Sequence, residues 1–270
     1  MCMKRHIQKS KQFRASVLEY WRVEGRHHLP WRKTRDPYHI LVSEMMLQQT
    51  QVDRVIPKFY AFIEKFPTVQ DLEKSAFADV LALWSGLGYN RRAKFLHECA
   101  RILIEKHGGV VPKDKETLLS LPGVGEYTAS AIGVFAYNRK EVLIETNIRT
   151  ALIHFFPQRK KVPDSKLAAI LEEMLPEIIS ARKWYSALMD YGAHIKRVHG
   201  NASRRSSGYK KQSRFKGSIR QVRGAVLKEL QKDRPKITAL PFAKEKIERA
   251  VAGLQRDALI TTQRGKLRIA

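Results

Sequence analysis

The stretch LPGVGEYTA, residues 121–129, sets a proline and two glycines between two apolar segments of the chain. Glycine permits a tight turn in which no side chain covers the backbone. The helix expected to start after Gly125 would offer its first N–H groups to an anion. A turn of this kind between two helices can hold a phosphate. Many helix-helix turns carry Gly and Pro, however, so the spacing alone does not define a function.

The chain is strongly basic. Its 270 residues include 51 Lys and Arg against 26 Asp and Glu, which gives a formal net charge of +25. Hydrophobic residues make up 43% of the chain. Such a charge indicates a polyanionic partner, most commonly nucleic acid. No apolar run approaches the roughly 18 residues that span a bilayer, and the start MCMKRHIQKS lacks the apolar segment of a secretory signal. We therefore expect an intracellular protein, in the cytoplasm or at the nucleoid, with no membrane contact.

The two cysteines, Cys2 and Cys99, can form neither a disulfide framework nor a Cys-based metal site of the usual spacing. Cys99 lies in the helical stretch FLHECARILI, where we expect it to be a small buried apolar residue. We predict no metal and no other cofactor.

Most of the chain has a helical pattern. Nine stretches before residue 196 carry apolar residues at three- and four-residue spacing, and one of them extends from 40 to 66. Prolines and glycines, Pro57 among them, punctuate the helices. Strand-like alternation is scarce before residue 235. The sequence therefore predicts an all-α fold.

The composition changes near residue 194. Residues 194–217 hold eight Lys or Arg and no acid, which is typical of a linker or of a phosphate-facing loop. Two helical patterns follow, with Pro235 expected to end the first, and the last residues predict a hairpin that turns at Arg264-Gly265. Together they indicate a winged-helix-like module, and a generic helical tail is the alternative. The predicted division is 1–193, 194–217 and 218–270.

The chain resembles the helix-hairpin-helix (HhH-GPD) DNA glycosylases from about residue 12 to residue 193, and among them the A/G-specific adenine glycosylases of the MutY type. Five blocks stand in the family's order: LPWR (29–32), DPYHILVSEMMLQQTQVDRVIPKFYAFIEKFP (36–67), LALWSGLGYNRRAKFLHECA (81–100), LPGVGEYTASAI (121–132) and ALMDYGA (187–193). The resemblance implies a two-lobed helical fold. It also implies a monomeric enzyme that acts on double-stranded DNA containing a mismatched or damaged base.

Two carboxylates match the residues that carry the family's chemistry. Cleavage of an N-glycosidic bond needs an acid for the leaving base and a negative charge near the sugar cation. Glu44 matches the general acid, which protonates adenine at N7, and its apolar flanks are expected to raise its pKa. Glu145 stands where the family has the aspartate of Asp-Gly-Asn, and Asn147 is retained. The side chain of Glu145 is one methylene longer than that aspartate. Its position just before a predicted helix is also consistent with a simple N-cap.

Tyr127 decides the reaction type that the resemblance implies. Lyase members of the superfamily have a lysine here, which forms a Schiff base with the sugar, and a tyrosine cannot do so. We therefore expect a monofunctional glycosylase in which Tyr127 supports the catalytic carboxylate. By the same resemblance, base flipping and DNA contact are assigned to Leu47, Gln48, Gln49, Tyr89, Gly123, Val124, Gly125, Thr128, Arg32, Arg149, Lys196 and Arg197.

Two departures from the family leave alternatives open. Most members carry four cysteines that hold an iron-sulfur cluster, and Lys196 stands near the first of these positions, so we expect no cluster and a phosphate-holding role for 194–217 instead. The residues that follow are too few for the domain that recognises 8-oxoguanine. A thymine or uracil mismatch glycosylase acting on T:G or U:G is therefore one alternative, and a lesion-binding protein without turnover is another. Glu44 favours a purine, since thymine needs no protonation at N7.

Overall fold

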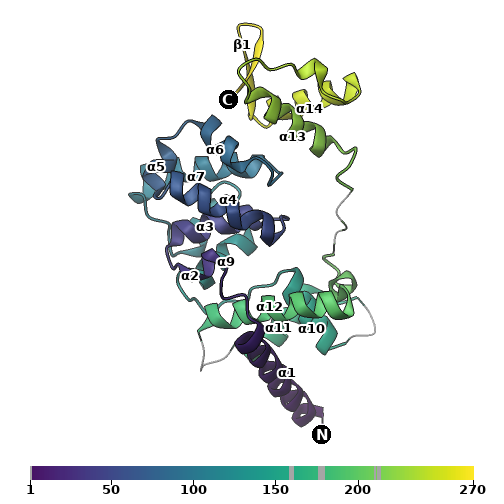
Figure 1. The fold of residues 1–270 in the computed structure, drawn as a ribbon. Helices are drawn as coiled ribbons and strands as arrows, with labels where there is room; N and C mark the ends of the chain where they lie inside the picture. The colour runs from purple at the N-terminus through teal and green to yellow at the C-terminus, as the bar shows by residue number, and fades with distance from the viewer. Residues whose placement is uncertain (1, 158–160, 176–179, 210, 212–213) are drawn as a thin grey trace. The chain divides into compact units, whose positions relative to one another are not determined.

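The computed structural model describes residues 2–157, 161–175, 180–209, 211 and 214–270 (Figure 1). Within these ranges the protein is mostly helical, which confirms the all-α prediction, and the one sheet among the described residues is a two-stranded hairpin. The chain divides into two compact units, and each of them combines segments that lie far apart in the sequence.

The first unit contains Met1–Pro37, Lys113–Lys115 and Gly125–Lys211. Its elements are α1 (Cys2–Glu24), α2 (Pro30–Lys33), α9 (Glu126–Phe135), α10 (Thr146–Phe155), α11 (Asp164–Met174), α12 (Ala181–His199) and the short 3-10 helix η1 (Ala202–Arg205). α10 and α12 pack against each other, and α1 lies against α12. Phe13, Trp184 and Tyr185 are fully buried in the core of this unit, so three large aromatic side chains anchor the helices on each other.

The second unit contains Tyr38–Pro112, Glu116–Val124 and Gln212–Ala270. Its first elements are α3 (Pro37–Leu47), α4 (Val52–Lys65), α5 (Val69–Glu73), α6 (Phe77–Trp84), α7 (Arg91–His107) and α8 (Lys115–Ser120). α3 has eight buried residues out of eleven, including Glu44. A helix that is apolar on nearly every side must be buried, and α3 therefore carries a carboxylate into the interior of this unit.

The same unit ends in a small module made of α13 (Ile219–Leu230), η2 (Ile237–Ala239), α14 (Lys244–Arg256), β1 (Ile260–Gln263) and β2 (Lys266–Ile269). The antiparallel hairpin turns at Arg264 and Gly265, both with positive φ, as predicted. β1 contacts α14 and β2 contacts α13 (Figure 1). α13 ends at Leu230, before Pro235 is reached, and the proline is therefore not what stops it.

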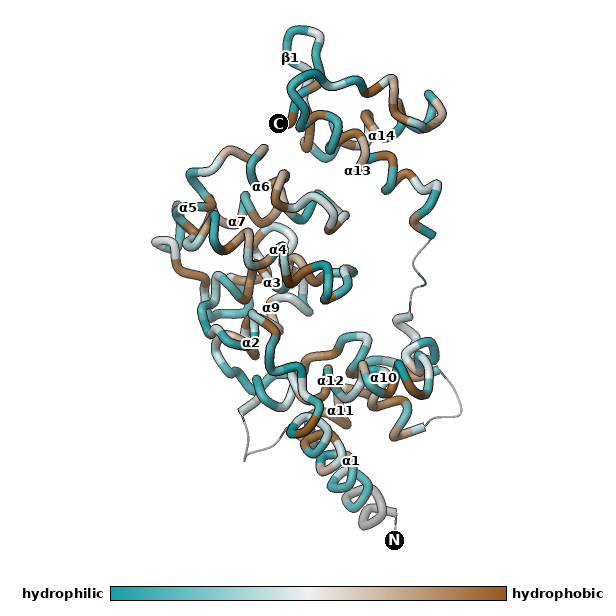
Figure 2. Tube along the Cα trace, in the orientation of Figure 1, coloured by the Kyte–Doolittle hydropathy of each residue, from teal (hydrophilic) through white to brown (hydrophobic). Residues whose placement is uncertain are grey.

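Two boundaries differ from the sequence prediction. The stretch 40–66 is not one helix: it divides into α3 and α4 at a turn in which Gln49 has a φ of 56°, whereas Pro57 lies inside α4 without ending it. α12 continues to His199, and Ile195 within it is buried, so the predicted linker begins inside a helix. Figure 2 shows apolar and polar residues alternating along the helices. None of the helices in the described ranges has the length and apolar character needed to cross a membrane.

Candidate active site

Glu145 is the N-cap of α10. Its Oε1 atom accepts hydrogen bonds from the backbone N–H groups of Asn147, at 2.8 Å, and of Ile148, at 2.9 Å. These are two of the N–H groups that a helix leaves without an intrahelical partner. Both of these hydrogen bonds go to Oε1, so the cap itself does not use Oε2. Capping and charge stabilisation are thus compatible in one side chain.

The surroundings of Glu145 hold it in place and change its titration. α12 crosses the start of α10 so closely that a Cβ atom on Gly192 would lie 2.0 Å from the carbonyl oxygen of Asn147. Burial raises the pKa of Glu145, and the two backbone N–H groups and the charges of Arg149 and Arg26 offset this only in part. Glycine at 192 is required by this approach, and the approach fixes where the capped carboxylate lies.

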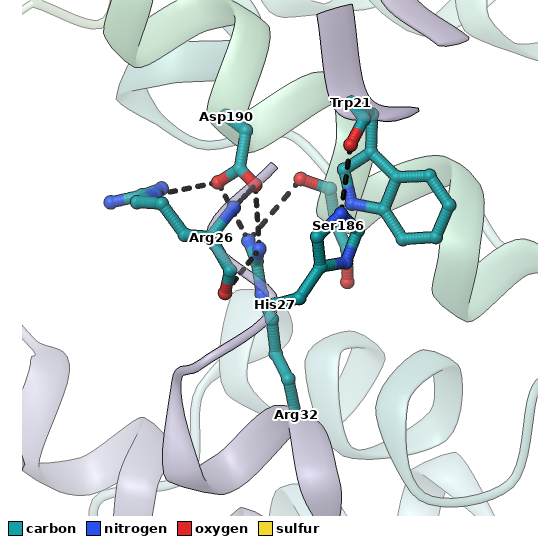
Figure 3. A network of polar contacts seen from close by, with 6 residues as sticks. All are labelled: Trp21, Arg26, His27, Arg32, Ser186 and Asp190. Carbon is teal, nitrogen blue, oxygen red and sulfur yellow. Dashed lines mark hydrogen bonds and ion pairs between the residues drawn. The ribbon is translucent and has the colours of Figure 1, made fainter. Parts of the chain in front are cut away.

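Asp190, on α12, is the centre of a buried ion-pair network (Figure 3). Its Oδ1 accepts from Arg26 Nε at 2.6 Å and from Arg32 Nη2 at 2.8 Å, and its Oδ2 accepts from Arg32 Nη1 at 2.6 Å and from the Arg26 backbone N–H at 2.8 Å. The side chain of Asp190 is 1% exposed. Burial alone would raise its pKa, but the hydrogen bonds and charges of Arg32 and Arg26 hold it below the usual value. The network fastens α2 and the segment before it to α12.

Asp190→Asn should destabilise the protein by about 3 kcal/mol, because removing one partner of a buried ion pair leaves the other charges uncompensated. Since the folded pKa of Asp190 is lowered, its contribution is fully present above pH 3.8 and is lost as the pH falls through the folded value. Urea unfolding at pH 7 measures the loss. Asp164→Asn is the matched control, because Asp164 also pairs with an arginine but is 42% exposed, and should cost below about 1 kcal/mol. Equal losses in the two variants would contradict the assignment.

The structure gives two of the predicted DNA-contacting arginines carboxylate partners within the first unit. Arg32, with a side chain 13% exposed, is held by Asp190 and by the carbonyl oxygens of Arg26 and Ser186. Arg149 forms a two-pronged pair with Asp164, at 2.9 and 2.6 Å. Their contact with DNA stays a prediction, and any such contact would compete with these pairs.

Lys196 and Arg197 lie exposed on the last turn of α12, on a helix and not on the predicted linker or loop. The chain after α12 is pinned back to α10: Asn201 Oδ1 accepts from the hydroxyl groups of Thr150, at 3.3 Å, and Ser203, at 2.5 Å. This part of the basic segment therefore has a fixed path along the first unit. A phosphate-holding role for it stays a prediction.

The turn at 121–125 has the geometry that its glycines predicted. Gly123 has a φ of 73°, and the Val124 N–H donates to the Leu121 carbonyl at 3.1 Å. Gly125 is the N-cap of α9 without a side-chain cap, so the first N–H groups of this helix are not covered by a capping side chain. The side chains of Val124 and Thr128 are buried, which leaves the backbone of these residues as their means of contact with an anion.

Cys99 supports this turn from α7. Its thiol donates a hydrogen bond to the Pro122 carbonyl at 3.1 Å, and the residue is fully buried, as expected. Burial raises the pKa of the thiol to about 12. Cys99 is therefore a structural residue and not a reactive one.

The two glycines of the turn should respond differently to alanine. A Cβ atom on Gly123 would lie 2.7 Å from Phe95 in a left-handed backbone conformation, so Gly123→Ala should destabilise the protein by about 1–3 kcal/mol. At Gly125 nothing lies within 4 Å and φ is −93°, so Gly125→Ala should change stability by less than about 0.5 kcal/mol. Its methyl group would nevertheless obstruct an anion, and we expect weaker duplex binding in a fluorescence-anisotropy titration. Unchanged affinity would mean that the turn does not approach a phosphate.

Glu44 lies in the second unit and is 6% exposed. Val42 and Met45 beside it are fully buried, as the apolar flanks suggested. α3 ends three residues later at Leu47, and the turn that follows carries Gln48 and Gln49. All three are predicted to contact DNA. Gln49 is exposed, whereas Gln48 reaches back to the carbonyl of Gly123 at 3.5 Å. The acid and the predicted base-flipping turn therefore belong to one helix and its end.

Tyr89 lies in the turn between α6 and α7 with a φ of 46°. Its hydroxyl accepts a hydrogen bond from Arg220 of α13 at 2.6 Å, and the guanidinium of Arg220 also lies over its ring. Sequence reasoning did not single out Arg220, nor did it find Arg92, which contacts the same turn from α7. Arg92 stands inside the block 81–100, but its partners at the end of α3, like the partner of Arg220, are far away in the sequence. The local pattern therefore did not reveal these contacts.

Tyr127 lies on the first turn of α9, half-buried against the core of the first unit. It belongs to the same unit as Glu145 and Asn147, whereas Glu44 belongs to the other. The two predicted carboxylates therefore lie in different units.

Comparison with known proteins identifies the class. Residues 42–177 match the family described as HhH-GPD superfamily base excision DNA repair protein, and the chain belongs to this family. It is 36% identical to an adenine DNA glycosylase of Mycolicibacterium smegmatis over 81% of this chain and 80% of that protein. It is 33% identical to an adenine DNA glycosylase of Mycobacterium tuberculosis H37Rv over 89% and 88%. Among solved structures, a thermostable thymine-DNA glycosylase is similar with a TM-score of 0.63 and 28% identity, over 74% of this chain and 93% of that one.

Proposed function

We propose that this protein is a monofunctional DNA glycosylase that removes adenine mispaired with 8-oxoguanine or guanine and leaves an abasic site. The observation that carries the proposal is the similarity to adenine DNA glycosylases over four fifths or more of both chains. Both carboxylates that the chemistry requires are present, one buried in α3 and one capping α10. The basic charge of the chain suits a DNA partner.

In the proposed reaction Glu44 donates a proton to N7 of the flipped adenine, and the bond between N9 and C1′ of the sugar breaks. The electron pair of that bond leaves with adenine. The carboxylate of Glu145 stabilises the sugar cation or adds to it. Water then forms the new bond to C1′, displacing Glu145 if it has added, and the proton that water releases restores the acid form of Glu44. Tyr127 offers no amine for a Schiff base, so the strand is not cut.

A second candidate is a mismatch glycosylase that removes thymine or uracil opposite guanine. It is favoured by the solved thymine-DNA glycosylase, of which this chain covers 93% at 28% identity. A protein that binds lesions without turnover is a third candidate, because Glu145 has a structural use as a cap that needs no catalysis.

Duplexes containing A:8-oxoG, A:G, T:G and U:G separate these functions. After incubation with the protein, alkali cuts the strand at abasic sites. Breaks confined to the two adenine duplexes support the proposal, and breaks confined to T:G or U:G support the second candidate. Tight binding without a break in any duplex would support the third candidate, a protein that binds lesions without turnover. Strand cutting without alkali would contradict the monofunctional assignment.

We further infer that the protein acts as a monomer on chromosomal DNA, at the nucleoid. In the predicted division, 1–193 would carry out excision and 194–217 would follow the DNA backbone. Residues 218–270 carry 13 Lys or Arg against five acids, and we infer that this module adds to duplex affinity.

A further inference from the structure

Arg92 is a buried arginine whose side chain donates hydrogen bonds to the end of α3, to the turn after α3 and to the turn before α7, all in the second unit. It is the second residue of α7 and is 6% exposed. Nη1 donates to the carbonyl oxygens of Met45, Met46 and Gln48 at 2.7, 2.9 and 2.7 Å. These carbonyls belong to the end of α3, where a helix has no N–H groups left to pair with them.

The other nitrogens of Arg92 hold the second turn and join it to the first. Nη2 donates to the carbonyl of Gly88 at 3.0 Å and to the hydroxyl of Thr50, also at 3.0 Å. Longer bonds reach the carbonyls of Leu87 and Tyr89, both at 3.4 Å. The acceptors are neutral, and burial lowers the pKa of the guanidinium to about 10, so it stays charged at neutral pH. One charged fork thus connects the turn after α3 with the turn before α7.

Both turns have a backbone that needs external support. Gln49 and Tyr89 have positive φ values of 56° and 46°, a conformation that residues other than glycine adopt at a cost. The turn 86–89 adds two glycines with positive φ, Gly86 and Gly88. Such turns persist where the surrounding structure fixes them, and Arg92 contacts the backbone of both.

We propose that Arg92 is a positioning residue for base flipping. By holding the two turns together, it places Gln49 and Tyr89 where they can enter the base stack and keep the target nucleotide out of the duplex. This inference rests on the proposed glycosylase function. It assigns Arg92 to the opening of the base pair and not to the cleavage of the N-glycosidic bond.

Arg92→Lys tests the proposal because it keeps the charge but removes the planar fork, and one ammonium group cannot reach both turns as the guanidinium does. Single-turnover excision is measured for adenine opposite guanine and for adenine opposite an abasic-site analogue, where no base pair has to be opened. The rate for adenine opposite guanine, divided by the rate for adenine opposite the abasic-site analogue, should be lower in Arg92→Lys than in the parent by about 10-fold or more. A loss of stability alone would slow both reactions equally and leave the ratio unchanged, which would overturn the proposal.

A second readout does not depend on excision. 2-Aminopurine placed next to the target adenine brightens when the stack opens, and Arg92→Lys should lose most of this signal at saturating protein. The neighbouring Arg91→Lys is the control, since the side chain of Arg91 is 59% exposed and should leave both readouts unchanged. If the parent opens the stack but excises no base, the proposed function fails while the role of Arg92 is still measured. A parent-like signal in Arg92→Lys would overturn the inference.

Thr50→Val extends the test in case Arg92→Lys does not fold. It removes one acceptor of Arg92 and leaves the buried charge in place. The rate ratio should change in the same direction by a smaller factor, about 3-fold, because one of the contacts between the turns is lost. A folded Thr50→Val protein with the parent ratio would contradict the clamping role.

Discussion

Glu145→Gln is expected to reduce adenine excision by a factor on the order of 10² to 10³ while the protein stays folded. The amide oxygen of glutamine can still accept the N–H groups of Asn147 and Ile148, so the cap of α10 is kept. The negative charge that would stabilise the sugar cation is lost. Single-turnover excision and thermal melting, measured on the same preparation, separate the two roles of the side chain.

Two further variants complete this experiment. Glu145→Asp keeps the charge and shortens the side chain, and we expect it to retain measurable excision. Glu145→Ala removes the cap and should destabilise the protein by about 1 kcal/mol. If Glu145→Gln and Glu145→Asp both excise adenine at the parent rate, Glu145 is a cap and nothing more.

The pH dependence of excision should follow from the same residue. The pKa of Glu145 is raised above 4.5, chiefly by burial, and the carboxylate form is the one that stabilises the cation. The rate should therefore fall as the pH decreases through a value above 4.5. Stability changes with pH in the opposite direction. Because the pKa of Glu145 is higher in the folded protein than in the unfolded chain, its titration favours the fold fully below pH 4.5. This contribution to the free energy of unfolding is lost as the pH rises through the folded pKa. Glu145→Gln is neutral at every pH and should remove this pH dependence of stability.

Glu44→Gln is expected to reduce excision by a factor on the order of 10² to 10⁴, the usual range for a general acid, and to leave duplex affinity unchanged. Glutamine has the size of glutamate but cannot transfer a proton to N7 of adenine. Affinity is measured on the A:G duplex by anisotropy, and excision by single turnover. Ser43→Ala, at the neighbouring buried position of α3, is the control for disturbance of the helix. Parent-like excision in Glu44→Gln would mean that another group supplies the proton.

Local features of the sequence predicted much of this structure. The all-α fold follows from apolar spacing, and the hairpin at Arg264-Gly265 follows from turn chemistry, because both depend on residues close in the chain. The cap that Glu145 forms was visible in the same way, since a carboxylate just before a helix can cap it; its catalytic role stays a prediction. The break at 48–51 was not, because helical spacing continues across it and the turn is held by an arginine more than forty residues away.

The sequence by itself determined the fold class, the tight glycine turn at 121–125 and the two carboxylates matched to the family. Only the tertiary structure decided which arginines are accessible and which are engaged. Arg32 is fastened to Asp190 from 158 positions away, and Arg92 is enclosed by carbonyl oxygens of two turns. The physical reason is that the sequence around an arginine does not show which hydrogen-bond acceptors its guanidinium contacts in the folded protein. Whether it serves DNA or the protein depends on which acceptors the folded chain brings within 3 Å of it.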